Sequence, residues 1–283
     1  MHMKPDEDAR REYWVEQMET AYDFMMQTLD YPVEECMEPF ASMPDAAEEA
    51  GVEVVFSDTK IVNDLDRVFM LRAGLLEDFV SIARKMNERG WILKVEDGFR
   101  TLEIQKFLAR KKGIFDTILE RVIWESGGEI PTPELLARRM AALIAFAPKV
   151  GTHMSGSAID ISVQRRDDGM ELDRGGPYIE LSELTPMASP FVSDEARINR
   201  KAITELMEHH GFMAYPYEFW HYNKGDVYDE LLNKTGRPGR YGAVDWDPEA
   251  NTVSPIEKPE MRLNLLEEIQ EDIEQALKRR EER

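Results

Sequence analysis

Apolar residues recur at helical spacing in several stretches of the chain. Between residues 65 and 86 they fall at positions 65, 68, 69, 75, 76, 79, 82, 83 and 86, and Gly90 follows as a stop signal. We therefore predict a core helix over 65–86. The same reasoning predicts helices over about 8–29, 101–124, 133–147 and 194–210. Three of these have a capping residue at the start, namely Thr101, Thr132 and Ser193.

Other stretches alternate in the manner of strands. Residues 91–95 alternate up to the Asp97-Gly98 turn, and 212–222 read as a strand interrupted by Pro216. In the segment 158–163, Ile159, Ile161 and Val163 share one face, so Asp160 should point away from the apolar side. Helices and strands mix without a regular βαβ rhythm, which favours the α+β class.

The two ends of the chain are charged and helical in pattern. After Pro259 an apolar stripe recurs through a charged segment, at Leu266, Ile269, Ile273 and Leu277. We expect this stripe to pack on the chain's own body, with a partner helix as the alternative. The predicted organisation is an N-terminal helical extension over 1–50, a catalytic domain over 51–250 and a C-terminal amphipathic helix over 251–283.

The composition indicates which binding partners are disfavoured and which cell compartment to expect. With 283 residues and 42% hydrophobic content the chain can bury a sizeable core, and its net charge of −21 disfavours nucleic acid and anionic membranes as partners. The longest apolar run, residues 140–147, is far shorter than the roughly 18 residues that span a bilayer. The single cysteine, Cys36, forms no intramolecular disulfide, so we expect a cytoplasmic protein. Oligomeric state leaves no mark on the sequence.

Two histidines and an aspartate form a candidate metal site. His153 and Asp160 lie seven residues apart, with Gly156 between them to allow a turn, and His221 follows much later. A catalytic zinc takes about three nitrogen or oxygen ligands and keeps one position open for water. The set therefore predicts one Zn²⁺ per chain, bound by His153, Asp160 and His221.

Two further residues have the chemistry of a hydrolase. Glu218 stands three residues before His221, a spacing that brings both side chains together only at a strand end or a bulge. There it would act as the general base for water activated by the metal. Arg100, after the Asp97-Gly98 turn, can offer a fixed cation to a tetrahedral oxyanion.

These residues also carry a family resemblance. Residues 151–160 match the pattern S-x-H-x-x-G-x-A-x-D, except that Gly151 replaces the serine. Residues 97–100 read D-G-F-R where the family has D-G-Y-R, and residues 218–221 match E-x-W-H. Residues 240–244 resemble the closing segment of the same family. The chain thus resembles the D-alanyl-D-alanine dipeptidases and related zinc D,D-carboxypeptidases over about residues 91–245, with both flanks outside the resemblance.

The resemblance implies a fold, a reaction and roles for residues. The fold would be a central antiparallel sheet flanked by helices, as also seen in Hedgehog signalling domains, and the reaction would be hydrolysis of short D-amino-acid peptides from cell-wall metabolism. It implies zinc ligation by the three residues named above, base catalysis by Glu218 and transition-state stabilisation by Arg100. Asp97 would bind the substrate ammonium group, and Ser155 and Tyr178 would also contact the substrate.

Departures from the family pattern leave alternatives open. Gly151 puts recognition of the substrate carboxylate in doubt. In dipeptidases an aspartate follows an M-G-x-x-[FY] run, whereas here no acidic residue directly follows Tyr178 and Glu180 is the nearest one. A D,D- or L,D-carboxypeptidase acting on longer cell-wall peptides is the main alternative. A non-haem iron oxygenase, which uses a similar ligand set, and a non-catalytic zinc-binding module are less favoured.

Overall fold

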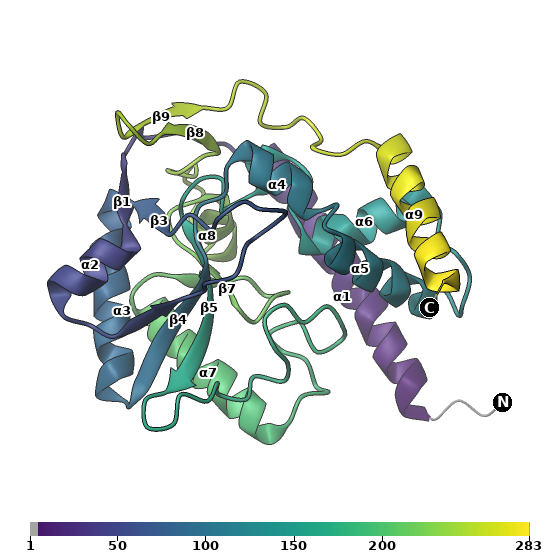
Figure 1. The fold of residues 1–283 in the computed structure, drawn as a ribbon, viewed down its shortest axis with the longest axis horizontal. Coiled ribbons are helices and arrows are strands. Elements are labelled where there is room, and N and C mark those ends of the chain that lie inside the picture. The colour runs from purple at the N-terminus through teal and green to yellow at the C-terminus, as the bar shows by residue number, and fades with distance from the viewer. Residues whose placement is uncertain (1–4, 283) are drawn as a thin grey trace.

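The computed structural model describes residues 5–282, which form one mixed sheet with helices on one face and a helical layer beside it (Figure 1). The sheet has the order β2-β4-β5-β7-β6. Its strands are β2 (Val54–Phe56), β4 (Trp91–Asp97), β5 (Ala158–Arg165), β7 (His221–Asn223) and β6 (Met213–Ala214). The β2–β4 pair is parallel and the other pairs are antiparallel. The predicted α+β class is confirmed, with a sheet that is mixed instead of wholly antiparallel.

The alternating pattern of β5 places this strand at the centre of the sheet. Ile159, Ile161 and Val163 are fully buried on one face, where they pack with residues of α3 (Leu76–Glu88) and α7 (Asp194–His209). The α2 helix (Met43–Ala50) packs against α3 on the same side (Figure 1). Asp160 therefore lies on the opposite face of β5, as its position in the alternation predicts.

A second core lies in the helical layer, away from the sheet. It is formed by α1 (Pro5–Asp30), α5 (Lys112–Glu125), α6 (Pro133–Leu143) and α9 (Leu266–Glu281), which gather on one side of the molecule (Figure 1). Ile269 and Ile273 of α9 are buried against α5 and α6, so the expectation that this stripe packs on the chain's own body is confirmed.

Two predicted helices differ from the structure. The segment 65–86 is helical only from Ala73, because Met70–Arg72 form β3, which pairs with β1 (Phe40–Ser42). The stretch 101–124 is divided into α4 (Leu102–Leu108) and α5, with a turn between them. The caps themselves are as expected, since the hydroxyls of Thr101, Thr132 and Ser193 each accept a backbone N–H of the first turn.

The remaining elements connect these layers. They are the short 3₁₀ turns η1 (Ala73–Leu75) and η2 (Pro148–Val150), the helix α8 (Val227–Leu232) and the hairpin of β8 (Val244–Asp247) with β9 (Thr252–Pro255). Helix α1 packs on α6 and α8, and residues 1–4 of the predicted N-terminal extension lie outside the described part. Among residues 5–282, no helix is long and apolar enough to cross a membrane.

Candidate metal centre and its pocket

Strand register brings the three predicted metal ligands together. Asp160 in β5 is paired directly with His221, the first residue of β7, and directly opposite residues place their side chains on the same face. His153 lies in the turn that precedes β5. That turn requires Gly156, whose φ is +68° and where a Cβ atom would lie 1.9 Å from the ring of Phe40.

The side chains of His153, Asp160 and His221 converge on one point. Asp160 Oδ1 lies 3.2 Å from His153 Nε2 and 3.0 Å from His221 Nδ1, and the three ligand atoms lie within 4.8 Å of one another. All three residues are buried, with exposed fractions of 4%, 2% and 5%. Two imidazole nitrogens and a carboxylate oxygen at such separations can share a single cation.

Contacts behind the imidazole rings fix their orientation. His153 Nδ1 lies 2.6 Å from the carbonyl oxygen of Gly98, which can only accept, so this nitrogen carries the proton and Nε2 is left to face Asp160. His221 Nε2 lies 2.9 Å from the hydroxyl of Thr152, which leaves Nδ1 to face Asp160. Outer hydrogen bonds of this kind are typical of histidines that ligate a metal, so the donor set fits Zn²⁺.

The charges around the cluster favour a cation. Burial alone would raise the pKa of Asp160. The contacts with His153 and His221 outweigh burial and hold this pKa well below its ordinary value. Burial lowers the pKa of His221, against the opposing effect of Asp160, and the neighbouring Arg100 lowers it further. An ionised carboxylate beside a neutral imidazole is the protonation state in which both bind a metal.

Arg100 bridges the cluster and a second buried carboxylate. Its Nε donates to Asp97 Oδ2 at 2.7 Å and its Nη2 donates to Asp160 Oδ2 at 3.1 Å, while Gln105 Oε1 lies 3.4 Å from Nη1. Although burial opposes the charged form, Asp97 and Asp160 hold the pKa of Arg100 above its ordinary value. Arg100 lines the pocket. Asp97 does not, because it is fully buried behind Arg100, so its contacts do not support the expected ammonium-binding role.

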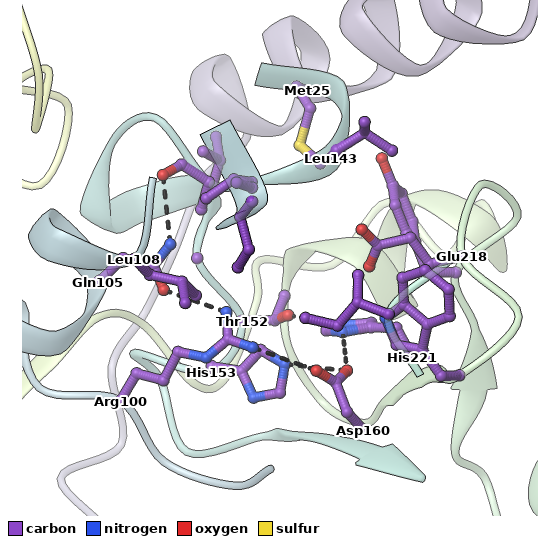
Figure 2. A pocket seen from close by; sticks show the side chains of 18 of the residues that line it. Met25, Arg100, Gln105, Leu108, Leu143, Thr152, His153, Asp160, Glu218 and His221 are labelled. Carbon is purple, nitrogen blue, oxygen red and sulfur yellow. Dashed lines mark hydrogen bonds and ion pairs between the residues drawn. The ribbon is translucent and has the colours of Figure 1, made fainter. Parts of the chain in front are cut away.

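Glu218 stands in the turn that leads into β7. The backbone N–H of His221 donates to the carbonyl of Glu218, so the two residues meet where a turn enters a strand. Their three-residue spacing was expected to require either a strand end or a bulge, and the strand end is observed. Burial raises the pKa of Glu218 well above its ordinary value and Asp160 adds to the increase, whereas Arg100 opposes it. Glu218 lines the same pocket as the cluster (Figure 2).

The other predicted substrate contacts divide between the pocket and its surroundings. Tyr178 lines the pocket and its hydroxyl donates to Asp160 Oδ2 at 3.0 Å. Ser155 is buried outside the lining, because its hydroxyl donates to the carbonyl of Thr152 and lies beside Ser157, which leaves it part of the turn. Glu180 lies in a neighbouring groove that shares only Leu181 with the pocket.

The pocket leaves an open space of about 60 Å³ and is lined from both layers of the fold. Besides the cluster, it is lined by side chains from the helical layer, among them Met25 of α1 and Leu143 of α6, which lie across the pocket from Asp160 in Figure 2. Sequence reasoning missed these residues and Thr152. Thr152 stands beside His153 in the motif, whereas nothing in the sequence near Met25 marks it as part of a site.

The fold and the cluster define a class of α+β proteins with a buried His-Asp-His cluster that could hold a metal ion. Residues 130–235 match the model of the peptidase M15 family, described as D-ala-D-ala dipeptidase. The matched segment contains His153, Asp160, Glu218 and His221. This similarity confirms the resemblance that the motifs predict.

Several curated relatives bear the same name. A D-alanyl-D-alanine dipeptidase from Enterococcus faecium is 35% identical over 77 residues, which are 27% of this chain and 38% of that protein. The dipeptidase from Synechocystis sp. is 24% identical over 223 residues, which cover 70% of this chain and 86% of that protein. The match thus spans well under half the length of the enterococcal relative and most of the cyanobacterial one.

Two solved structures are similar at low identity. The LdcB LD-carboxypeptidase shares 18% identity over 74% of this chain and 79% of that chain, with a TM-score of 0.37. A variant of the vancomycin resistance D,D-pentapeptidase VanY, in complex with Zn(II), shares 16% identity over 75% of this chain and 95% of that chain, with a TM-score of 0.35.

Proposed function

We propose that the chain is a zinc-dependent peptidase that hydrolyses short D,D-peptides such as D-alanyl-D-alanine. The observation that carries the proposal is that Glu218 and Arg100 line one pocket with the His153, Asp160 and His221 cluster. A base and a cation beside a metal site are the groups that peptide hydrolysis needs. They would have no evident task in an oxygenase or in a non-catalytic binding module.

The three clustered residues would hold one Zn²⁺ per chain. The ligand atoms would be His153 Nε2, His221 Nδ1 and a carboxylate oxygen of Asp160, because the other imidazole nitrogens are occupied by Gly98 and Thr152. Zinc in this position would polarise the scissile carbonyl and lower the pKa of water to about 7.

The protein's own residues would move the proton and balance the charge. Glu218 takes a proton from the attacking water as the water oxygen bonds to the carbonyl carbon. It then passes the proton to the amine nitrogen as the carbon–nitrogen bond breaks. A carboxylate that lines the pocket beside the cluster can hold this proton between the two steps. Arg100 balances the negative charge that develops on the carbonyl oxygen.

A second candidate is a D,D- or L,D-carboxypeptidase that acts on longer peptides. Within the described residues, Asp160 and Glu218 are the acids that line the pocket, and both are engaged in the site itself. A free dipeptide would therefore find no separate carboxylate for its ammonium group, since Asp97 is buried and Glu180 lies in the neighbouring groove. This observation favours substrates whose amino group is already part of a peptide bond.

A mass-spectrometric screen separates these candidates. The zinc-loaded protein is incubated with free and N-acylated D,D-, L,D- and L,L-peptides, and products are identified by mass. We expect cleavage of D,D-peptides, and a preference for the acylated forms would favour the carboxypeptidase. Cleavage confined to L,L-peptides, or no cleavage of any peptide, would contradict the proposal. The cytoplasmic location stays a prediction.

A further inference from the structure

Two buried arginines lie against the ring of Phe219, the residue that follows Glu218 in the chain. The guanidinium carbon of Arg174 lies 4.9 Å from the centre of this ring, and that of Arg200 lies 4.2 Å from it. Each arginine is 3% exposed and Phe219 is 1% exposed. Attraction between a cation and an aromatic face is strongest where both are shielded from water. The turn that carries Glu218 is therefore held at its neighbouring residue.

Neither arginine has an acidic partner. Among the residues that the structure describes, no ion pair joins either guanidinium to a carboxylate, and Arg200 donates to the main-chain carbonyls of residues 174, 184, 186 and 187. Burial lowers the pKa of Arg174, and burial together with Arg174 lowers the pKa of Arg200 to about 10. A buried cation without a counter-charge costs free energy. Sequences break local rules of this kind mainly at functional sites, so we expect the pair to serve the site beside it.

Arg174 joins the strand of Asp160 to the turn of Glu218. Its Nη2 donates to the hydroxyl of Ser162 at 3.0 Å, and its Nη1 lies 3.5 Å from the carbonyl oxygen of Phe219. Ser162 stands two residues after Asp160 in β5, so the two side chains share one face of the sheet. One planar guanidinium thus spans the strand that supplies a proposed metal ligand and the turn that supplies the proposed base.

The backbone of Phe219 has no other support. The carbonyl of Trp220 accepts the backbone N–H of Ile161 at 2.9 Å, which fixes the far side of the turn to β5. Within residues 5–282, in contrast, the carbonyl of Phe219 accepts a hydrogen bond from Arg174 alone, and no main-chain hydrogen bond reaches either of its backbone groups. The side of the turn next to Glu218 therefore depends on a side chain for its position.

We propose that Arg174 is a positioning residue, which sets the place of the Glu218 carboxylate relative to the metal cluster by holding Phe219. The proposal rests on the proposed peptidase function and adds a residue to its machinery that does not touch the substrate, since Arg174 does not line the pocket. Misplacing a reacting group by about 1 Å can cost roughly 100-fold in rate. A loosened turn should therefore be visible in turnover.

A double-mutant cycle with Arg174→Met and Glu218→Gln tests the proposal on zinc-loaded proteins. Methionine fills much of the same space and no carboxylate loses a partner, so the variant should fold. Alone, Arg174→Met should keep its zinc, change KM little and lower kcat by about 10- to 100-fold. In the Glu218→Gln background it should lower kcat no further, because the base that it positions is gone. A further loss as large as in the wild-type background would overturn the proposal.

Two other variants separate this link from general effects. Arg174→Lys keeps the charge without the planar group, so it should recover part of kcat, and it replaces Arg174→Met in the cycle if that variant does not fold. Arg197→Met is the control, because Arg197 holds the neighbouring loop by donating to the carbonyls of residues 190 and 192. It should leave kcat unchanged. A loss of kcat in Arg197→Met equal to that in Arg174→Met would overturn the specific role of Arg174.

Hydrogen exchange followed by mass spectrometry distinguishes the failure of this proposal from that of the proposed function, because it needs no substrate. The backbone N–H groups of residues 215–221 should exchange faster in zinc-loaded Arg174→Met than in the wild type, and at the wild-type rate in Arg197→Met. Faster exchange, with no peptide cleaved by the wild type, would support the hold on the turn and refute the peptidase function. Unchanged exchange and unchanged kcat in Arg174→Met, with cleavage by the wild type, would refute the positioning role alone.

Discussion

Replacing Arg100 by alanine should impair both turnover and stability. The guanidinium lies between two buried carboxylates, 2.7 Å from Asp97 and 3.1 Å from Asp160, and only 11% of its side chain is exposed. For catalysis, the loss resembles the deletion of one oxyanion donor, which lowers turnover by roughly 10²- to 10³-fold. The Michaelis constant should change modestly, because the negative charge that Arg100 is proposed to balance develops only as water adds to the carbonyl.

The structure also predicts that this change lowers the free energy of unfolding. Removing one partner of a buried ion pair typically destabilises a protein by about 3–5 kcal/mol. We expect the lower end, because Asp97 keeps a 3.7 Å contact with Arg67 and the N–H of Gly98, and Asp160 keeps both histidines. Lysine should restore part of the turnover, because it carries the charge without the planar guanidinium.

Two assays test this reasoning on the same proteins. Steady-state kinetics on the peptide identified by the screen give turnover and the Michaelis constant, and denaturant unfolding gives the free energy of unfolding of Arg100→Ala and Arg100→Lys. A large rise in the Michaelis constant with unchanged turnover would make Arg100 an anchor for the substrate carboxylate. An unchanged free energy of unfolding would refute its role in the buried network.

Three further predictions concern the metal ligands, the hydroxyl behind His221 and the contact that holds α9. Metal analysis should find about one zinc per chain in the wild type and strong loss in His153→Ala and His221→Ala; undiminished zinc in both would refute the assignment of ligands. Thr152→Val removes the hydroxyl behind His221, so competition with a chelator should show zinc affinity about 10- to 100-fold weaker. Arg110→Ala removes two hydrogen bonds to Asp272 of α9. Denaturant unfolding should show a free energy of unfolding that is lower by about 1 kcal/mol.

Local signals in the sequence account for much of the fold and for the core of the site. Helix caps such as Thr132 and the alternation around Asp160 depend on near neighbours along the chain, and both appear in the structure as predicted. The metal cluster was predictable because its residues stand in motifs of fixed spacing. The roles assigned to these residues stay predictions.

Features that depend on distant contacts were not predictable. The strand at Met70–Arg72 continues a helical apolar pattern, and only its pairing with β1, some thirty residues earlier, makes it a strand. Met25 enters the pocket because α1 packs on α6, more than a hundred residues away in sequence. The motif around Ser155 likewise could not reveal that its hydroxyl turns inward to Thr152.

The central claim is that this chain hydrolyses peptides with a metal centre and with Glu218 as the base. The most direct measurement compares the hydrolysis rate of one D,D-peptide by the wild type and by Glu218→Gln, at equal measured zinc content. We predict that the variant keeps its zinc and loses roughly 10²- to 10⁴-fold in turnover. A variant that cleaves the peptide as fast as the wild type would contradict the claim.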